Sequence, residues 1–190
     1  MPNDPVVCRS TGTTVSKLAA WLTGHERENI ARFIQERFRE RYFAPIEAIR
    51  PAQKDGFLIM GVSCLTLESI EAFRKGWPST ERHSREAFEG FLRREPRFTL
   101  FRSHEGRFYE NVRCGILHRA ETLGGWRIRR SGPLFDAASL TINATDFHRQ
   151  LEGALFDYVG ELRNSDFRSP VWKKARRRLS NLVTNCEVPK

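Results

Sequence analysis

Arg113 and His118 are the two residues of this sequence best suited to chemistry on a phosphate group. An arginine guanidinium carries a permanent positive charge and binds phosphate oxygens two at a time. A histidine titrates near neutrality and can take up or release a proton. The pair therefore supplies the two functions that an RNA strand needs for its own 2′-hydroxyl to attack the neighbouring phosphate.

The spacing of the two residues limits how they can cooperate. They are five positions apart on a predicted apolar helix over residues 107–119. On an ideal helix this corresponds to a rotation of about 500° and a rise of about 7.5 Å, so the side chains leave the axis about 140° apart. They do not stack on one face, but both can border a groove between helices. Gly115 between them allows another backbone segment to approach closely.

Two carboxylates on a preceding apolar helix, Glu68 and Glu71, are candidates for supporting residues. A carboxylate that faces His118 would orient the imidazole ring and favour its charged form. The alternative is that both carboxylates are exposed and pair with Arg74 or Lys75.

The other histidines indicate no site. They lie after a glycine that ends a helix, in polar loops or on a packing face, and we expect them to be solvated or to cap helices: His25, His83, His104 and His148. Arg97 and His104 also have a motif-like spacing, but they lie on a connector after Pro96 with no helix predicted to hold them.

The chain is strongly basic and rich in arginine. It has 26 arginines and 6 lysines, a net charge of +9 and an isoelectric point near 9.9. This composition suits a polyanionic partner such as RNA, although a GC-rich genome, whose codons favour arginine, would give the same counts with the charges on solvated helix faces. Arg127, Arg129 and Arg130 are candidates for sequence-independent contacts with an RNA backbone. The basic face at 173–178 is equally compatible with phosphate contacts and with plain solvation.

No motif for a cofactor or a metal ion is present. The sequence lacks GxxxxGK[ST], GxGxxG, HExxH and GxSxG, and it has no acidic cluster suited to magnesium. The cysteines are scattered without a CxxC pair, which indicates neither a disulfide framework nor a zinc site: Cys8, Cys64, Cys114 and Cys186. We therefore expect no cofactor and no metal.

Hydrophobic periodicity predicts an all-α bundle with one small β-hairpin. The predicted helices cover residues 14–23, about 28–49 with a bend at Pro45, 57–77, 84–94, 107–119, 145–162 and from 170 onward. Two alternating runs, Trp126–Arg130 and Leu134–Ile142, surround a turn and predict a hairpin insertion at about 126–142.

We expect a flexible lead-in over residues 1–13 and a single helical domain over 14–190. No apolar run approaches the roughly 20 residues of a membrane span. The N-terminus does not resemble a signal peptide, so a cytoplasmic location without membrane contact is predicted.

The segment Phe108-Tyr109-x-x-Val112-Arg113-Cys114-Gly115-Ile116-Leu117-His118 resembles the R-x(4–6)-H motif of the HEPN superfamily. The resemblance in helix order extends over about residues 28–185. It implies a four- to five-helix bundle and a metal-independent endoribonuclease in which Arg113 and His118 are catalytic. It further implies a toxin or antiviral defence effector that forms a homodimer with a composite active site, with an antitoxin or regulatory protein as a further partner.

Two departures from the family pattern keep other functions open. Cys114 follows the motif arginine, where active members often carry Asn, Asp or another polar residue that supports the site. Ala120 occupies the tyrosine position of the R-x(4)-H-x-Y group, which argues against a toxin modified at that tyrosine. The alternative functions are a non-catalytic HEPN-like module that binds nucleic acid, a nucleotide or a protein, and a helical regulatory or scaffold protein.

Overall fold

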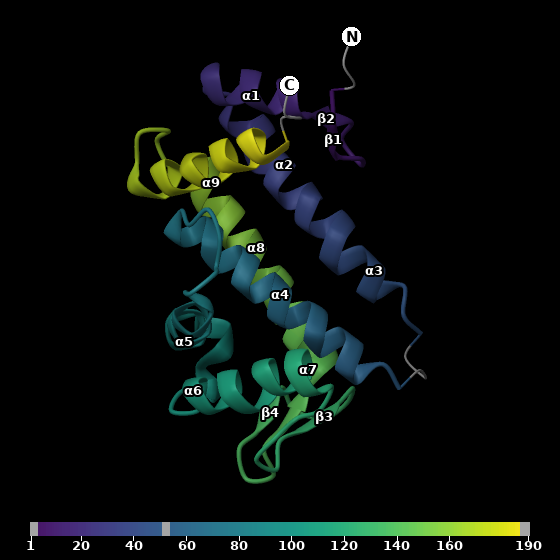
Figure 1. Cartoon of the computed structure of the whole chain (residues 1–190). Coiled ribbons are helices and arrows are strands. Elements are labelled where there is room, and N and C mark those ends of the chain that lie inside the picture. Colours follow the sequence, from purple (N-terminus) through teal and green to yellow (C-terminus); the bar gives the residue numbers. More distant parts are fainter. Residues whose placement is uncertain (1–3, 51–53, 187–190) are drawn as a thin grey trace. The chain divides into compact units, whose positions relative to one another are not determined.

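The computed structural model describes residues 4–50 and 54–186 and is mostly helical (Figure 1). The α-helices are α1 (Val15–Thr23), α2 (Arg27–Phe38), α3 (Ala44–Glu47), α4 (Gly56–Lys75), α5 (Ser84–Arg94), α6 (Glu105–Phe108), α7 (Cys114–Arg119), α8 (Ala144–Asn164) and α9 (Pro170–Cys186). Two π-helical segments, η1 (Arg39–Phe43) and η3 (Tyr109–Arg113), and the 3-10 helix η2 (Pro96–Phe101) complete the helical part. The prediction of a mainly α-helical chain is confirmed.

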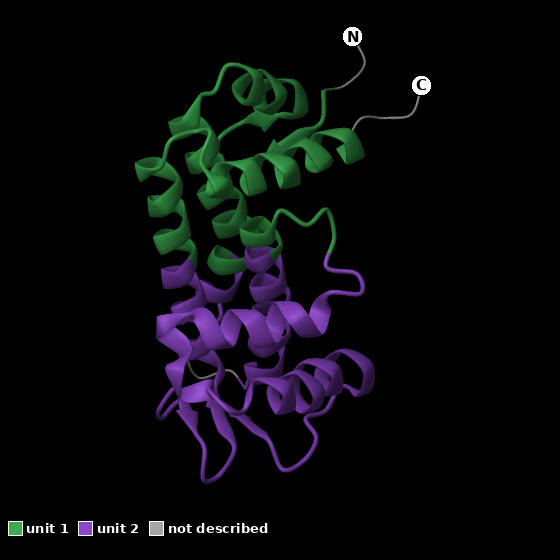
Figure 2. Cartoon of the chain, turned by 90° about the vertical axis from the view of Figure 1, so that its left-hand side faces the viewer, with its two compact units in different colours: residues 1–44, 72–79, 155–190 green, residues 45–71, 80–154 purple. Residues whose placement is uncertain are grey.

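The chain forms two compact units, each built from segments that are distant in sequence (Figure 2). Unit 1 consists of residues 1–44, 72–79 and 155–190, and unit 2 of residues 45–71 and 80–154. Both α4 and α8 pass from one unit into the other. The sequence predicts one helical domain over residues 14–190, whereas the structure has two compact units with shared helices.

The helix predicted at about 28–49 is present as α2, η1 and α3 in succession. Pro45 has no N–H to donate to the carbonyl of Arg41, and its ring crowds that carbonyl. The helix widens into the π-helical segment η1 directly before Pro45. The irregularity therefore lies one turn before the proline and not at it.

The predicted flexible lead-in contains two short strands, β1 (Val6–Cys8) and β2 (Thr13–Thr14), which pair antiparallel. The side chains of Val7 and Cys8 are buried in unit 1. Residues 1–3 of the lead-in lie outside the described part of the chain. The apolar pair Val7-Cys8 is too short to show any periodicity, which is why composition alone favoured a flexible segment.

Glu40 in η1 holds this strand pair. Its carboxylate accepts hydrogen bonds from the backbone N–H of Arg9 at 2.9 Å and of Ser10 at 3.0 Å. Burial raises the pKa of Glu40, but these hydrogen bonds stabilise the charged form and outweigh burial, so the pKa of Glu40 is lowered overall.

The predicted hairpin is wrong in its topology. The strands β3 (Arg127–Arg129), β4 (Phe135–Asp136) and β5 (Thr141–Asn143) form one sheet in the order β3-β5-β4. β3 pairs with β5 in parallel, with Ile128 opposite Ile142. β4 pairs with β5 antiparallel. The antiparallel partner of β5 is thus β4, inside the run Leu134–Ile142 that is predicted to be a single strand.

A turn around Asp136 explains this difference. The Asp136 carboxylate accepts hydrogen bonds from the backbone N–H of Ala138 and Ser139, and Leu140 has a φ of 51°. An aspartate that binds the backbone two residues ahead is a turn signal. The run Leu134–Ile142 therefore folds back on itself, and β3 fills the other edge of β5.

Unit 2 has a core of aromatic side chains. Its buried rings are Phe88, Phe91, Phe98, Phe101, Phe108, Trp126, Phe135 and Phe147. The rings of Phe108 and Phe147 stack at a centroid distance of 5.4 Å. Because Phe108 directly precedes η3, this packing fixes the start of the segment that carries Arg113.

The inner face of α9 packs into the core of unit 1. Trp172, Ala175 and Leu179 on that face are fully buried, and the Trp172 indole N–H donates to the carbonyl of Leu162 at 2.8 Å. α9 packs against α1 in this unit. The basic side chains of α9 are left on its other faces.

Among the described helices, α4 alone is long and apolar enough to cross a membrane by length and composition. In the structure, 67% of its most apolar window is buried. Such burial is typical of the core helix of a globular unit.

Candidate functional site

The motif segment is helical along its whole length, as predicted. α6, η3 and α7 follow one another without a break from Glu105 to Arg119. Arg113 is the last residue of the π-helical segment η3, and His118 lies in the last turn of α7. Single π-turns within helices often occur at functional sites.

Arg113 is bound to a carboxylate on α4. Its Nε donates to Glu68 Oε1 at 2.8 Å, and its terminal nitrogen donates to Ser84 Oγ of α5 at 2.9 Å. The side chain of Arg113 is 15% exposed and that of Glu68 is 9% exposed. The guanidinium is therefore fixed in position at the edge of unit 2.

Glu68 accepts further hydrogen bonds from two hydroxyl groups. Thr80 donates at 3.0 Å and Ser84 at 2.7 Å, so three donors surround this carboxylate. Burial lowers the pKa of the Arg113 guanidinium, but the charge of Glu68 and its hydrogen bond outweigh burial and raise it overall. Arg113 is fully charged at any physiological pH.

Glu71, the other candidate, belongs to a separate ion pair. It is fully buried, and Arg94 of α5 donates to both of its oxygens. The expectation that Glu68 and Glu71 are exposed partners of Arg74 or Lys75 is wrong, because both are buried. Their polar partners come from α5, from Thr80 before it and from Arg113 of η3. Neither carboxylate contacts His118 in the described part of the chain.

Tyr109 and Cys114 complete the surroundings of Arg113. The guanidinium lies 5.6 Å from the centroid of the Tyr109 ring. Burial, with a smaller contribution from Cys114, raises the pKa of Tyr109. Cys114 is half-buried beside these two residues, and Cys64 on α4 is buried with its pKa raised by burial. Burial thus keeps the Cys64 thiol neutral near the Arg113–Glu68 pair.

His118 stands apart from this network. Its side chain is exposed, and it forms no hydrogen bond or ion pair with any residue that the structure describes. Arg113, by contrast, is directed towards α4 and α5. Within a single chain the structure therefore does not bring the two motif residues into contact.

Gly115 lies where the chain turns back after α7. A Cβ at this position would collide with the backbone carbonyl of Glu121. Ala120 ends α7 in the left-handed conformation with a φ of 57°, and the N–H of Leu123 then donates to the carbonyl of Asn111 at 2.9 Å. The close backbone that Gly115 was expected to admit is thus the returning segment of the same chain.

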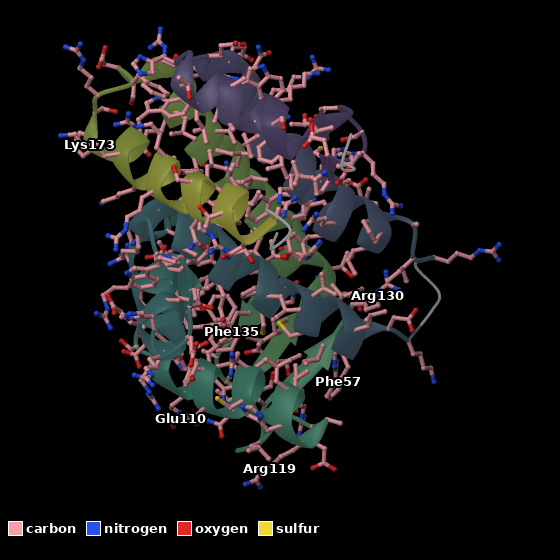
Figure 3. The ribbon with its side chains drawn as sticks, turned by 45° about the horizontal axis from the view of Figure 1, so that its top comes forward. Phe57, Glu110, Arg119, Arg130, Phe135 and Lys173 are labelled. Carbon is pink, nitrogen blue, oxygen red and sulfur yellow. The ribbon has the colours of Figure 1, made fainter. Side chains whose placement is uncertain are left out.

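Exposed apolar side chains lie on α4 and on α7, the helix that carries His118. We name them the α4–α7 surface, and its members are Phe57 at 43% exposure, Leu58 at 56%, Leu65 at 46% and Leu117 at 40%. The two helices touch here, because a Cβ on Gly61 of α4 would lie 3.7 Å from Ile116 of α7. In Figure 3 the labels Phe57 and Arg119 mark the two helices.

The three arginines proposed to bind RNA differ in their surroundings. Arg127 and Arg129 lie on one face of β3, both are exposed, and neither side chain forms a hydrogen bond or ion pair with a described residue. Arg130 donates to Thr145 at 3.2 Å and to the backbone carbonyl of Arg50 at 2.8 Å, so it links segments of unit 2 (Figure 3). No contact joins these arginines to Arg113 or His118.

The other side chains suited to acid–base chemistry or metal binding do not form a second site in the described part of the chain. His148 is buried and hydrogen-bonded through Nδ1 to Ser63 at 2.9 Å. Over residues 4–50 and 54–186, no group of three His, Cys, Asp or Glu side chains is placed to hold a metal ion.

Three members of the Arg113 network were not identified from the sequence: Thr80, Ser84 and Tyr109. Ser84 begins α5, where a serine usually serves as a helix cap, so its type gave no sign of a contact with Arg113. Only Tyr109 had a usable signal, because it precedes Arg113 by one helical turn.

No protein-family model, curated protein or solved structure matches this chain.

Proposed function

We propose that this protein is a metal-independent endoribonuclease of the HEPN type that cleaves single-stranded or loop RNA. The observation that supports this most is the fixed guanidinium of Arg113, held by Glu68 and Ser84 at the edge of unit 2. An exposed, unengaged histidine follows it on the same helical segment. A rigid cation for a phosphate and an accessible titrating group are the two requirements of the reaction.

In the proposed reaction, His118 removes the proton from a 2′-hydroxyl, and the 2′-oxygen attacks the adjacent phosphorus. The bond to the 5′-oxygen breaks, and a second histidine gives this oxygen a proton. Arg113 stabilises the non-bridging oxygens as they gain negative charge. The products are a 2′,3′-cyclic phosphate and a 5′-hydroxyl. Unstacked RNA is the substrate, because its 2′-hydroxyl can swing into line with the scissile bond.

We place the active site between two copies of the chain. One His118 cannot be protonated and unprotonated at once, whereas two copies can divide the acid and base roles. The α4–α7 surface is an apolar area on α4 and on the helix that carries His118, and a second copy would cover it. A two-fold dimer through this surface brings two motif segments together. The HEPN resemblance further suggests a cytoplasmic toxin or defence effector that is controlled by an antitoxin or regulatory protein.

The test is incubation of mixed RNA with the full-length protein in the presence of EDTA, followed by analysis of the RNA ends. We expect cleavage with 2′,3′-cyclic phosphate ends, and a loss of at least about a hundredfold in rate for His118→Ala. His104→Ala is the matched control, because His104 belongs to the other Arg–His pair of similar spacing and should retain activity. Arg113→Lys keeps the positive charge but loses the planar guanidinium that binds two phosphate oxygens at once, so RNA cleavage by this variant should be slower as well.

A second candidate function is a non-catalytic module that binds nucleic acid. The pairing of Arg113 with Glu68 favours it, because much of the cation's charge is neutralised within the chain. RNA left intact at equimolar protein, together with unchanged RNA affinity of His118→Ala, would establish this function and exclude the nuclease.

A further inference from the structure

Unit 1 contains a basic pocket whose residues are distant in sequence from the HEPN-like motif at 113–118. It has a volume of about 670 Å³ and lies between the end of α1 and the outer face of α9. We name it the α1–α9 basic pocket, and its lining residues are Leu22, Thr23, Lys173, Arg176, Arg177 and Ser180. Three of the six are cations, and none is acidic.

The helical period of α9 explains this concentration of charge. Positions 173, 176, 177 and 180 follow the i, i+3, i+4, i+7 pattern and therefore lie on one stripe of the helix. α9 contains five basic residues and no acidic residue. Trp172, Ala175 and Leu179 occupy the buried face beside this stripe. The packing of α9 thus fixes the direction in which the stripe points.

The cations of this pocket are not paired with an acidic residue in the described part of the chain. The side chains of Lys173 and Arg177 are exposed and form no ion pair or hydrogen bond with described residues, and Figure 3 shows Lys173 extending outward from α9. Arg176 lies over the ring of Phe167 at 4.7 Å, and its Nε has no hydrogen-bond partner. Like charges this close on one helix repel each other. An anion in the pocket would relieve the repulsion.

We propose that the α1–α9 basic pocket binds the phosphates of a single nucleic-acid strand. Lys173 and Arg177 are one helical turn apart, about 6 Å along the axis, which lets them contact successive phosphates of one strand. Ser180 adds a free hydroxyl donor, whereas the Thr23 hydroxyl donates to the carbonyl of Ala19. The pocket has no aromatic or amide side chain that could read a base, so the contacts are independent of sequence.

A nucleic acid fits this pocket better than a membrane surface does. A helix that binds membranes presents apolar side chains beside its basic ones. Here the apolar face of α9 is buried in unit 1, and none of the large exposed hydrophobic residues described lies on α1 or α9. The site is independent of cleavage, because no residue of the HEPN-like motif takes part.

The test measures binding of the full-length protein to a labelled 20-nucleotide oligothymidine strand by fluorescence anisotropy over a range of salt concentrations. This strand has no 2′-hydroxyl and cannot be cleaved by the proposed nuclease, so the two proposals are tested separately. The variant is Lys173→Gln/Arg177→Gln. Arg176 is left intact because it packs on Phe167. The matched control is Arg168→Gln/Lys174→Gln, which removes the same charge from exposed positions outside the pocket.

We expect the variant to bind about tenfold or more weakly than the wild type. The slope of log affinity against log salt should fall by about 1.4, since each phosphate contact to a single strand contributes about 0.7. The control should keep nearly the wild-type slope. Equal losses in variant and control would show that only net charge matters, and would overturn the proposal. Absence of strand binding, or binding to anionic phosphatidylserine vesicles alone, would overturn it as well.

Discussion

At the scale of single residues, the distinctive feature is a charged pair at the edge of unit 2. Glu68 accepts hydrogen bonds from Arg113, Thr80 and Ser84, and both members of the pair are largely removed from water. A buried carboxylate without its partners would be costly. The network therefore serves folding, and it also fixes the guanidinium that the proposed reaction requires.

Glu68→Gln tests the structural part of this role. The substitution keeps the shape but removes the negative charge, leaving the half-buried Arg113 without its anion. We expect the free energy of unfolding to fall by about 1–3 kcal/mol, measured by urea denaturation. The control is Glu110→Gln, since Glu110 pairs with Arg85 at the surface with 56% and 50% exposed side chains. For Glu110→Gln we expect the free energy of unfolding to fall by less than about 1 kcal/mol. Equal effects of the two substitutions would contradict the assigned importance of Glu68.

At the scale of elements, the position of His118 depends on how α7 ends. Gly115 is packed against the returning backbone at Glu121, and Ala120 supplies the left-handed residue that reverses the chain. α7 is only six residues long. The orientation of α7 is therefore set by η3 before it and by the returning segment after it, and not by helix propensity alone.

Gly115→Ala should destabilise the protein, because the new methyl group collides with a backbone carbonyl that cannot move without opening the turn. We expect a loss of about 1–3 kcal/mol in the free energy of unfolding. Gly160→Ala on α8 is the matched control, since a Cβ there meets nothing within 4 Å. It should stabilise the protein by up to about 1 kcal/mol through helix propensity. If both substitutions changed the free energy of unfolding in the same direction in urea denaturation, this would show that the turn after α7 can adjust to the added methyl group.

At the scale of the whole molecule, the proposed active site requires two chains. Leu58→Asp/Leu65→Asp places two charges on the α4–α7 surface without touching the buried core. We expect each substitution to weaken self-association at least about tenfold, because each leucine would lose more than about 1.4 kcal/mol of apolar burial. Sedimentation velocity at micromolar concentrations measures this directly.

Leu100→Asp is the control for the dimer, because Leu100 is 55% exposed on η2 and outside this surface. It should leave self-association unchanged. RNA cleavage should fall together with dimer formation in the Leu58/Leu65 variant. A strictly monomeric wild-type protein with full nuclease activity would refute the composite site.

The helical framework followed from the sequence because its signals are local. The period of apolar residues located α5 at its observed ends, Ser84 and Arg94, and located the other long helices to within a few residues. The motif helix was found in the same way. Side chains three or four positions apart share a face in any helix, whatever surrounds it.

The sheet, the pairing of charges and the two units were decided by tertiary structure. Nothing local indicated that β5 would pair with β3 in parallel, because strand pairing is a contact between distant segments. Nor could the sequence show that Glu68 would pair with Arg113 and leave His118 without a partner among the described residues. A buried charge is stabilised only by the groups that the fold brings next to it. Local period fixes which face of a helix is apolar, but only packing decides which neighbour covers it and which polar groups must find partners there.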